Sequence, residues 1–267
     1  GDHGFGWRGL CVDDSHGSQT LFLADLSAAL AAAPAPVDIV LLDNCLMQTV
    51  ETLYDLAQGG AAYALGSQNY SESDWPYRTM LSGLFANPDW PAGVAARDIH
   101  SRLAAHYAAV PGITLALSDL AHVPVLASNL LALSDAMLQP ALPFAALQAR
   151  AQSVMEAIDR TVIAEYHGAN WTGKAHGVSI YFPEREFDLV WHAPDAFYFY
   201  TSAICSWAGT FWHDLLDLYF TGMEDMSGRR IRYEVIDIHR EITAYFDLPQ
   251  EQLDLYDFCA RIVNADY

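Results

Sequence analysis

The feature that most constrains the fold is a short, almost wholly apolar run over residues 37–42, which leads through Asp43-Asn44-Cys45 into an amphipathic stretch. Such a run is typical of a strand covered on both faces of a parallel sheet. Residues 46–58 carry apolar side chains at helical spacing and end at Gly59-Gly60, and residues 61–66 suggest another strand. A strand, a helix and a strand in this order predict an α/β fold with a mostly parallel sheet flanked by helices.

The same alternation of patterns continues along the chain. Helical spacing predicts helices over residues 20–33, 92–110, 123–137, 144–166, 206–220 and 250–263. Short β-prone runs predict strands over residues 113–117, 178–182 and 231–236, and residues 76–91 are expected to be irregular. A chain of 267 residues holds one large domain, with or without an appendage. We predict a catalytic core over residues 1–120, its continuation through 121–220 as a helical hairpin, a strand and a helix, and a mixed C-terminal appendage over 221–267.

Charge and composition exclude some classes of function. The net charge is −20 and Lys174 is the only lysine, which argues against a nucleic-acid partner, because phosphates require basic patches. No uninterrupted apolar run reaches the roughly 18 residues of a membrane span. The four cysteines, Cys11, Cys45, Cys205 and Cys259, are too sparse for a disulfide scaffold and have no metal-ligand spacing.

His3 and Cys45 are the candidate catalytic pair. Ligands of an open parallel sheet bind beyond the carboxyl ends of its strands, where both residues are expected. The predicted helix after Cys45 would favour a thiolate at its N-terminus, and His3 would protonate the leaving amine. Backbone N–H groups of Gly4 and Cys45 are candidate oxyanion donors. The alternatives are a buried structural cysteine and a loop histidine that bonds its own backbone.

Asp2-His3-Gly4-Phe5-Gly6-Trp7 and Asp43-Asn44-Cys45-Leu46-Met47, followed by Glu51, resemble the clostripain family of cysteine peptidases, which has a caspase-like fold. Trp75-Pro76-Tyr77 and residues 116–120 and 177–183 extend the resemblance over about residues 1–220. The family implies endopeptidase activity through a His–Cys dyad, which falls on His3 and Cys45. Its fold also implies strands before His3, which we expect to be missing from this chain.

Asp43 is the candidate specificity residue. Side chains two apart on a strand point to the same side, so Asp43 should reach the cleft of Cys45. The resemblance implies an aspartate here that accepts arginine or lysine. Asp74, or alternatively Glu72, is the candidate for a second acidic wall, with Trp75 beside it. A bidentate carboxylate clamp suits arginine best. The alternative is that Asp43 caps the next helix.

Two further interpretations stay open at this point. Asp2, Asp13, Asp14 and His16 could start a calcium site, although a solvated acidic loop is the preferred interpretation of these residues. Together with His3, the same residues could instead support a metal-dependent hydrolase. The peptidase chemistry itself requires no cofactor. A catalytically inactive relative that binds a peptide or a partner is the other rival. The expected partner is a protein or peptide substrate with basic residues, and the resemblance favours a secreted or cell-envelope location.

Overall fold

The computed structural model describes residues 10–13, 15, 17, 19–72, 74–138, 142–173, 175–183 and 233–237. Its strands are β1 (Cys11–Asp13), β2 (Gln19–Leu21), β3 (Ile39–Leu41), β4 (Tyr63–Gly66), β5 (Thr114–Asp119), β6 (Val162–His167), β7 (Ser179–Pro183) and β8 (Tyr233–Asp237). Its helices are α1 (Leu23–Ala31), α2 (Val50–Gln58), α3 (Tyr77–Met80), α4 (Ser82–Ala86), α5 (Ala92–His106), α6 (Val123–Met137) and α7 (Phe144–Thr161), with the 3-10 turns η2 (Leu120–His122) and η3 (Ala169–Trp171).

The central sheet has the strand order β3-β4-β5-β6 and is mixed. β3 runs parallel to β4, with Ile39 opposite Tyr63, whereas β4/β5 and β5/β6 are antiparallel. The predicted α/β class is confirmed, but the prediction of a mostly parallel sheet does not hold for these four strands. The connections between strands explain these pairings. The single helix α2 crosses over between β3 and β4, so these two strands run in the same direction. Between β5 and β6 the chain runs out along α6 and back along α7, so these two strands run in opposite directions.

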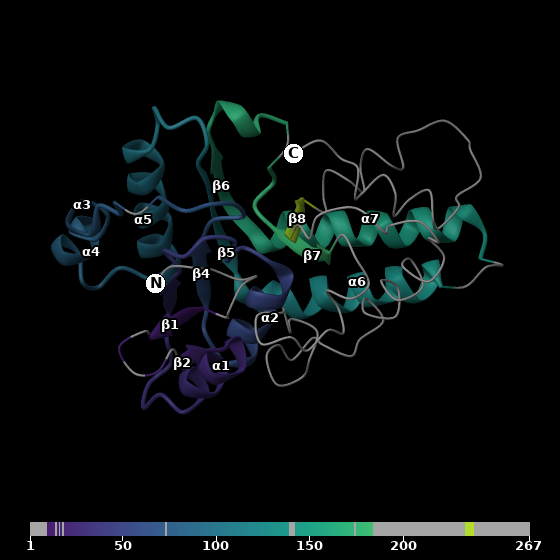
Figure 1. Cartoon of the computed structure of the whole chain (residues 1–267), viewed down its shortest axis with the longest axis horizontal. Coiled ribbons are helices and arrows are strands. Elements are labelled where there is room, and N and C mark those ends of the chain that lie inside the picture. Colours follow the sequence, from purple (N-terminus) through teal and green to yellow (C-terminus); the bar gives the residue numbers. More distant parts are fainter. Residues whose placement is uncertain are drawn as a thin grey trace.

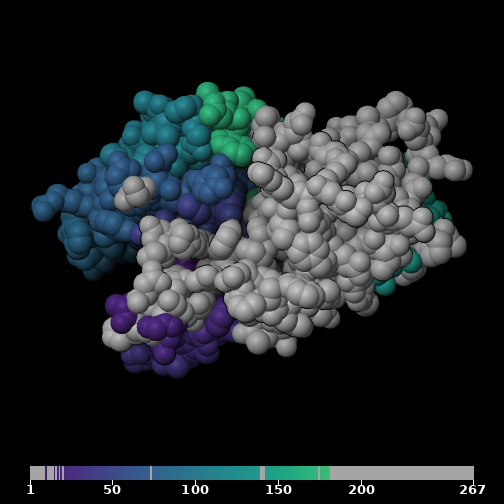
Figure 2. Space-filling model, in the orientation of Figure 1, coloured from purple at the N-terminus to yellow at the C-terminus, as the bar shows by residue number. Residues whose placement is uncertain are grey.

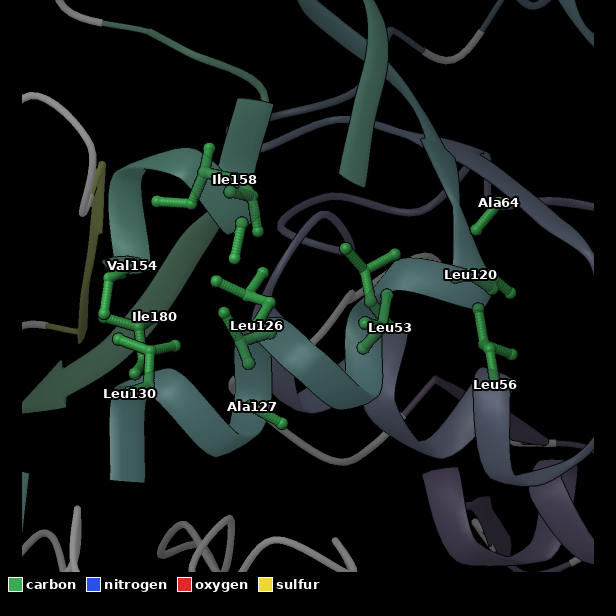
Figure 3. Close-up of a cluster of buried hydrophobic side chains, with 14 of the residues drawn as sticks. Leu53, Leu56, Ala64, Leu120, Leu126, Ala127, Leu130, Val154, Ile158 and Ile180 are labelled. Carbon is green, nitrogen blue, oxygen red and sulfur yellow. The ribbon is translucent and has the colours of Figure 1, made fainter. Parts of the chain in front are cut away.

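Helices cover both faces of this sheet, as Figure 1 shows. Alternation along β4 sends Ala64 into the cluster formed with α2, α6 and α7, and Leu65 into the cluster beneath α5. In Figure 3, Leu126 and Leu130 of α6 point toward Val154 and Ile158 of α7. The segment with α3, α4 and α5, blue and teal in Figure 2, forms the left-hand surface of that view.

Four predicted helix boundaries are wrong by three residues or more. The helix predicted over residues 20–33 begins at Leu23, because Gln19–Leu21 forms β2, and the helix predicted over residues 92–110 ends at His106. The helix predicted from residue 46 begins at Val50, because Leu46 has φ 60° and the Thr49 side chain caps the helix by accepting from the Thr52 N–H. The helix predicted to residue 166 ends at Thr161, and Val162–His167 forms β6 instead. β-branched residues and pairing with β5 favour the strand there.

The remaining predicted elements agree more closely. The helix over 123–137 matches α6, while β7 and β8 match the strands predicted over 178–182 and 231–236 within two residues. The region 76–91, expected to be irregular, contains the short helices α3 and α4. The predicted helices over 206–220 and 250–263 lie outside the described residues. β8 pairs antiparallel with β7, and the three-part division of the chain stays a prediction.

One stretch has the length and composition of a membrane span. Residues Leu120–Met137 have a mean hydropathy of 1.3 over 18 residues, and half of the window is buried inside the protein. Its buried side chains, among them Leu126 and Leu130, belong to the core shared with α2 and α7. Packing within the fold therefore accounts for its apolar character.

His100 on α5 is a buried ionisable group that makes stability depend on pH. Its side chain is buried, with the residue only 6% exposed, and Nε2 has no hydrogen-bond partner among the described residues. Burial lowers the pKa of His100, Arg97 lowers it slightly further, and a hydrogen bond with the Leu115 backbone opposes the shift. The folded chain therefore holds this imidazole neutral at pH values where the unfolded chain protonates it.

We predict that the free energy of unfolding falls as the pH drops below about 6.5, with a slope of at most about 1.4 kcal/mol per pH unit from this group. The sign follows because the unfolded state binds the extra proton. Urea unfolding between pH 5.5 and 7.5 should show a shallower slope for His100→Leu. His122→Leu, which removes a more exposed histidine, is the control. Equal slopes for His100→Leu and the wild type would contradict this prediction.

Candidate active site

Cys45 lies on the turn between β3 and α2, half-buried. The turn is fixed on both sides: Asn44 Nδ2 donates to the Leu10 carbonyl at 2.7 Å, and the Leu46 N–H donates to the Asn69 carbonyl at 2.8 Å. α2 begins only at Val50, so the predicted place of Cys45 at a helix N-terminus is wrong. The helix dipole decays within one turn and contributes little at this distance.

A backbone donor supplies the sulfur contact instead. The Ser71 N–H donates to Cys45 Sγ at 3.2 Å, and Ser71 Oγ accepts from the Trp75 indole Nε1 at 2.9 Å. Trp75 is only 6% exposed and belongs to the cluster beneath α5. A buried ring therefore holds the serine whose amide bonds the thiol. This contact fixes the sulfur of Cys45 relative to Ser71 and Trp75.

Two buried glutamines hold this turn and the following loop against the sheet. Gln48, fully buried, donates from Nε2 to the Ala116 carbonyl at 2.8 Å and accepts from Ser118 Oγ at 3.1 Å. Gln68 donates to Ser179 Oγ at 3.0 Å and accepts from the Gly177 N–H at 2.7 Å. The two side chains thus join the turn after β3 and the loop after β4 to β5 and β7.

Sequence reasoning missed both glutamines. The available signal was their position, because each follows an apolar strand at the edge where ligands bind in α/β sheets. Their partners Ser118, Ser179 and Gly177 are far away in the chain, so the hydrogen bonds themselves could not be read from local pattern.

Asp43 is exposed on the same turn as Cys45. Its Oδ2 accepts a hydrogen bond from Tyr77 Oη, which together with partial burial and the Asp43 charge raises the pKa of Tyr77 to about 12. β3 ends at Leu41, so the strand alternation used to aim Asp43 does not extend to it. The helix-cap alternative also fails, because Thr49 is the cap of α2.

Asp74 is exposed, and a second tyrosine contacts it. Tyr107 Oη donates to Asp74 Oδ1 at 3.4 Å, and His106 Nε2 lies 3.9 Å from Oδ2. Burial raises the pKa of Tyr107 most, and the charges of Asp74 and Glu72 raise it further. Trp75, predicted beside Asp74 as a wall of the substrate site, has its ring mainly in the core and its centroid 6.4 Å from that of Tyr77.

Several predicted site residues lie outside the described residues: Asp2, His3, Gly4, Asp14 and His16. Asp13 is described only as part of the backbone of β1. Within the described part of the chain, no three His, Cys, Asp or Glu side chains converge as a metal site would require. The calcium site therefore stays a prediction, as do the roles of His3 and Gly4.

An α/β sheet that presents a cysteine on a turn after a strand, with the sulfur held by a backbone amide, is an arrangement suited to a cysteine hydrolase. The sequence profile of the clostripain family of peptidases (C11) matches residues 1–188, well over half of the chain. The chain belongs to the clostripain family, whose members are cysteine peptidases, and the predicted resemblance is confirmed.

Similar solved structures share low identity with this chain. A B. fragilis cysteine protease is 21% identical over 62% of this chain and 86% of its own, with a TM-score of 0.47. A clostripain from Bacteroides thetaiotaomicron, in complex with a peptide inhibitor, is 17% identical over 64% and 89%, with a TM-score of 0.48. An inactive zymogen C11 protease from Parabacteroides distasonis is 15% identical over 96% and 68%, with a TM-score of 0.47. The comparison with curated proteins finds no match.

We predict that Trp75→Phe slows alkylation of Cys45 by iodoacetamide about threefold at pH 7, because loss of the indole donor loosens the Ser71 amide. Peptide mapping by mass spectrometry gives the rate at Cys45 alone. Trp171→Phe is the matched control, since the Trp171 Nε1 donates to the Gly112 carbonyl at the same 2.9 Å in a different part of the fold. Equal rates at Cys45 in the two variants would contradict a role for the Trp75–Ser71 bond.

Proposed function

We propose that this chain is an endopeptidase that cleaves after arginine or lysine, with Cys45 as nucleophile and His3 as acid and base. The observation that carries the proposal is a pair of contacts from Ser71 and Tyr77 to the turn that follows β3. Ser71 bonds the sulfur of Cys45, and Tyr77 bonds the carboxylate of Asp43. Residues 71–77 thereby hold a nucleophile and an acidic group that are only two residues apart.

The chemistry follows the usual course of acyl transfer to a thiolate. Cys45 Sγ forms a bond to the scissile carbonyl carbon, and the N–H groups of Gly4 and Cys45 stabilise the resulting oxyanion. The carbon–nitrogen bond breaks as His3 gives a proton to the leaving amine. Water, deprotonated by His3, then hydrolyses the thioester and frees the sulfur. These steps use protein groups only, and calcium remains a structural option at Asp2, Asp13, Asp14 and His16.

Charge supports a basic residue before the scissile bond. Asp43, Glu72 and Asp74 are all exposed, and all three influence the pKa values of Tyr77 or Tyr107. Asp43 is linked to Glu72 and Asp74 through these two tyrosines, and the net charge of −20 adds a field that attracts cations. Trp75 supports this region from the core, through Ser71 and through its ring beside Tyr77. The partners we propose are proteins or peptides with basic residues, and the location we propose is the cell envelope or the exterior.

We predict that Cys45→Ala abolishes hydrolysis of peptide amides with arginine or lysine before the scissile bond. Asp43→Asn should lower kcat/KM for both substrates roughly 10- to 100-fold, the range expected when a charged hydrogen-bond acceptor is lost. Fluorogenic peptides that differ only in that residue provide the measurement. Asp38→Asn removes an exposed carboxylate at the other end of β3 and should leave the rates unchanged.

Two results would replace the proposal. Hydrolysis that survives Cys45→Ala and is abolished by a chelator would identify a metal-dependent hydrolase. Binding of basic peptides without turnover, with or without added calcium, would identify an inactive relative that acts as a binding module. Turnover that is unaffected by Asp43→Asn would retain the peptidase and remove Asp43 as its specificity residue.

A further inference from the structure

Asp43 and Asp74, two of the exposed carboxylates of the proposed specificity site, each accept a hydrogen bond from a tyrosine hydroxyl. Tyr77 Oη donates to Oδ2 of Asp43, and Tyr107 Oη donates to Oδ1 of Asp74. The two tyrosines belong to neighbouring elements, α3 and the end of α5, and the presence of Tyr77 raises the pKa of Tyr107. The acidic groups therefore meet a substrate with one oxygen of each carboxylate occupied.

We infer that Tyr77 determines specificity by making Asp43 a single-oxygen acceptor, and that the chain therefore prefers lysine to arginine before the scissile bond. The inference rests on the proposed function, since it assigns the choice between the two basic side chains to one residue of that site. It reverses the expectation from sequence that a bidentate clamp would favour arginine.

The geometry of the two cations explains the preference. A guanidinium gains most when two parallel N–H groups meet both oxygens of one carboxylate. With Tyr77 on Oδ2, that fork must share an oxygen with a phenol. An ammonium carries three independent donors and can bond Oδ1 of Asp43 and a lone pair of the Tyr77 hydroxyl at the same time.

The tyrosine contacts persist over the pH range in which a peptidase works. The pKa of Tyr77 is raised to about 12, with the hydrogen bond to Asp43 as the largest cause, so the hydroxyl stays protonated as a donor. Tyr77 is 49% exposed, so its hydroxyl also remains within reach of a substrate side chain. Glu72, Asp74 and His106, which also lie near the pair of tyrosines, do not distinguish an ammonium from a guanidinium by shape.

The test is the ratio of kcat/KM for two peptide amides that differ only in lysine or arginine at the cleavage position. We expect the wild type to favour lysine. Tyr77→Phe should raise the arginine-to-lysine ratio about fivefold, because arginine gains a free oxygen and lysine loses an acceptor. Tyr70→Phe, which changes a 72% exposed tyrosine in the preceding loop, should leave the ratio unchanged.

A ratio is the informative quantity, because a general loss of structure or of active enzyme lowers both rates equally. An unchanged ratio in Tyr77→Phe, or a shift toward lysine, would overturn the inference while leaving basic specificity in place. A wild type that prefers arginine would also overturn it. A wild type that cleaves neither substrate would overturn the proposed basic specificity, and the inference with it.

Discussion

The hydrogen bonds of Gln48 are the interaction on which the site depends. The side chain is fully buried and bonds β5 through both its donor and its acceptor. Its backbone N–H donates to the Ser67 carbonyl at 3.0 Å, and its carbonyl accepts from the Ser179 N–H at 2.9 Å. A buried amide left unpaired costs about 1–3 kcal/mol, so the turn after β3 has one favourable position relative to three other segments. The position of this turn determines where Cys45 and Asp43 lie.

The site is assembled from short-range turns and long-range contacts. β3 delivers Asp43 and Cys45 to the carboxyl edge of the sheet, and Thr49 starts α2 four residues beyond the cysteine. The three intervening residues allow Leu46 to adopt a positive φ and turn the chain. The segment 71–77 then returns to the turn from the other side. Cys45, the proposed nucleophile, and the Asp43 carboxylate are thereby held by a single loop that is anchored in the core through Trp75.

The local sequence pattern predicts those parts of the fold that depend on residues close together in the chain. The apolar run 37–42, the helical spacing after it and the glycines at 59–60 located β3, the end of α2 and the cysteine between them. The predicted start of α2 is wrong because apolar residues at helical spacing begin at Leu46, whereas the Thr49 cap fixes the start of the helix at Val50. Leu46 bonds Asn69 and lies outside the helix. The sequence pattern over residues 162–166 predicts helix, because the pairing of β6 with β5 is a tertiary effect that local pattern does not show. The Tyr77–Asp43 bond and the glutamine network join residues 34 to 111 positions apart, and no local pattern indicates them.

The central claim is that Cys45 is a nucleophile whose site selects basic side chains. Labelling with two peptide chloromethyl ketones, one ending in lysine and one in a neutral residue of similar length, tests both parts together. Intact-mass analysis and peptide mapping on the wild-type chain should find one adduct, on Cys45, that forms much faster with the lysine reagent. An adduct on Cys11, Cys205 or Cys259, or equal labelling by the two reagents, would contradict the account.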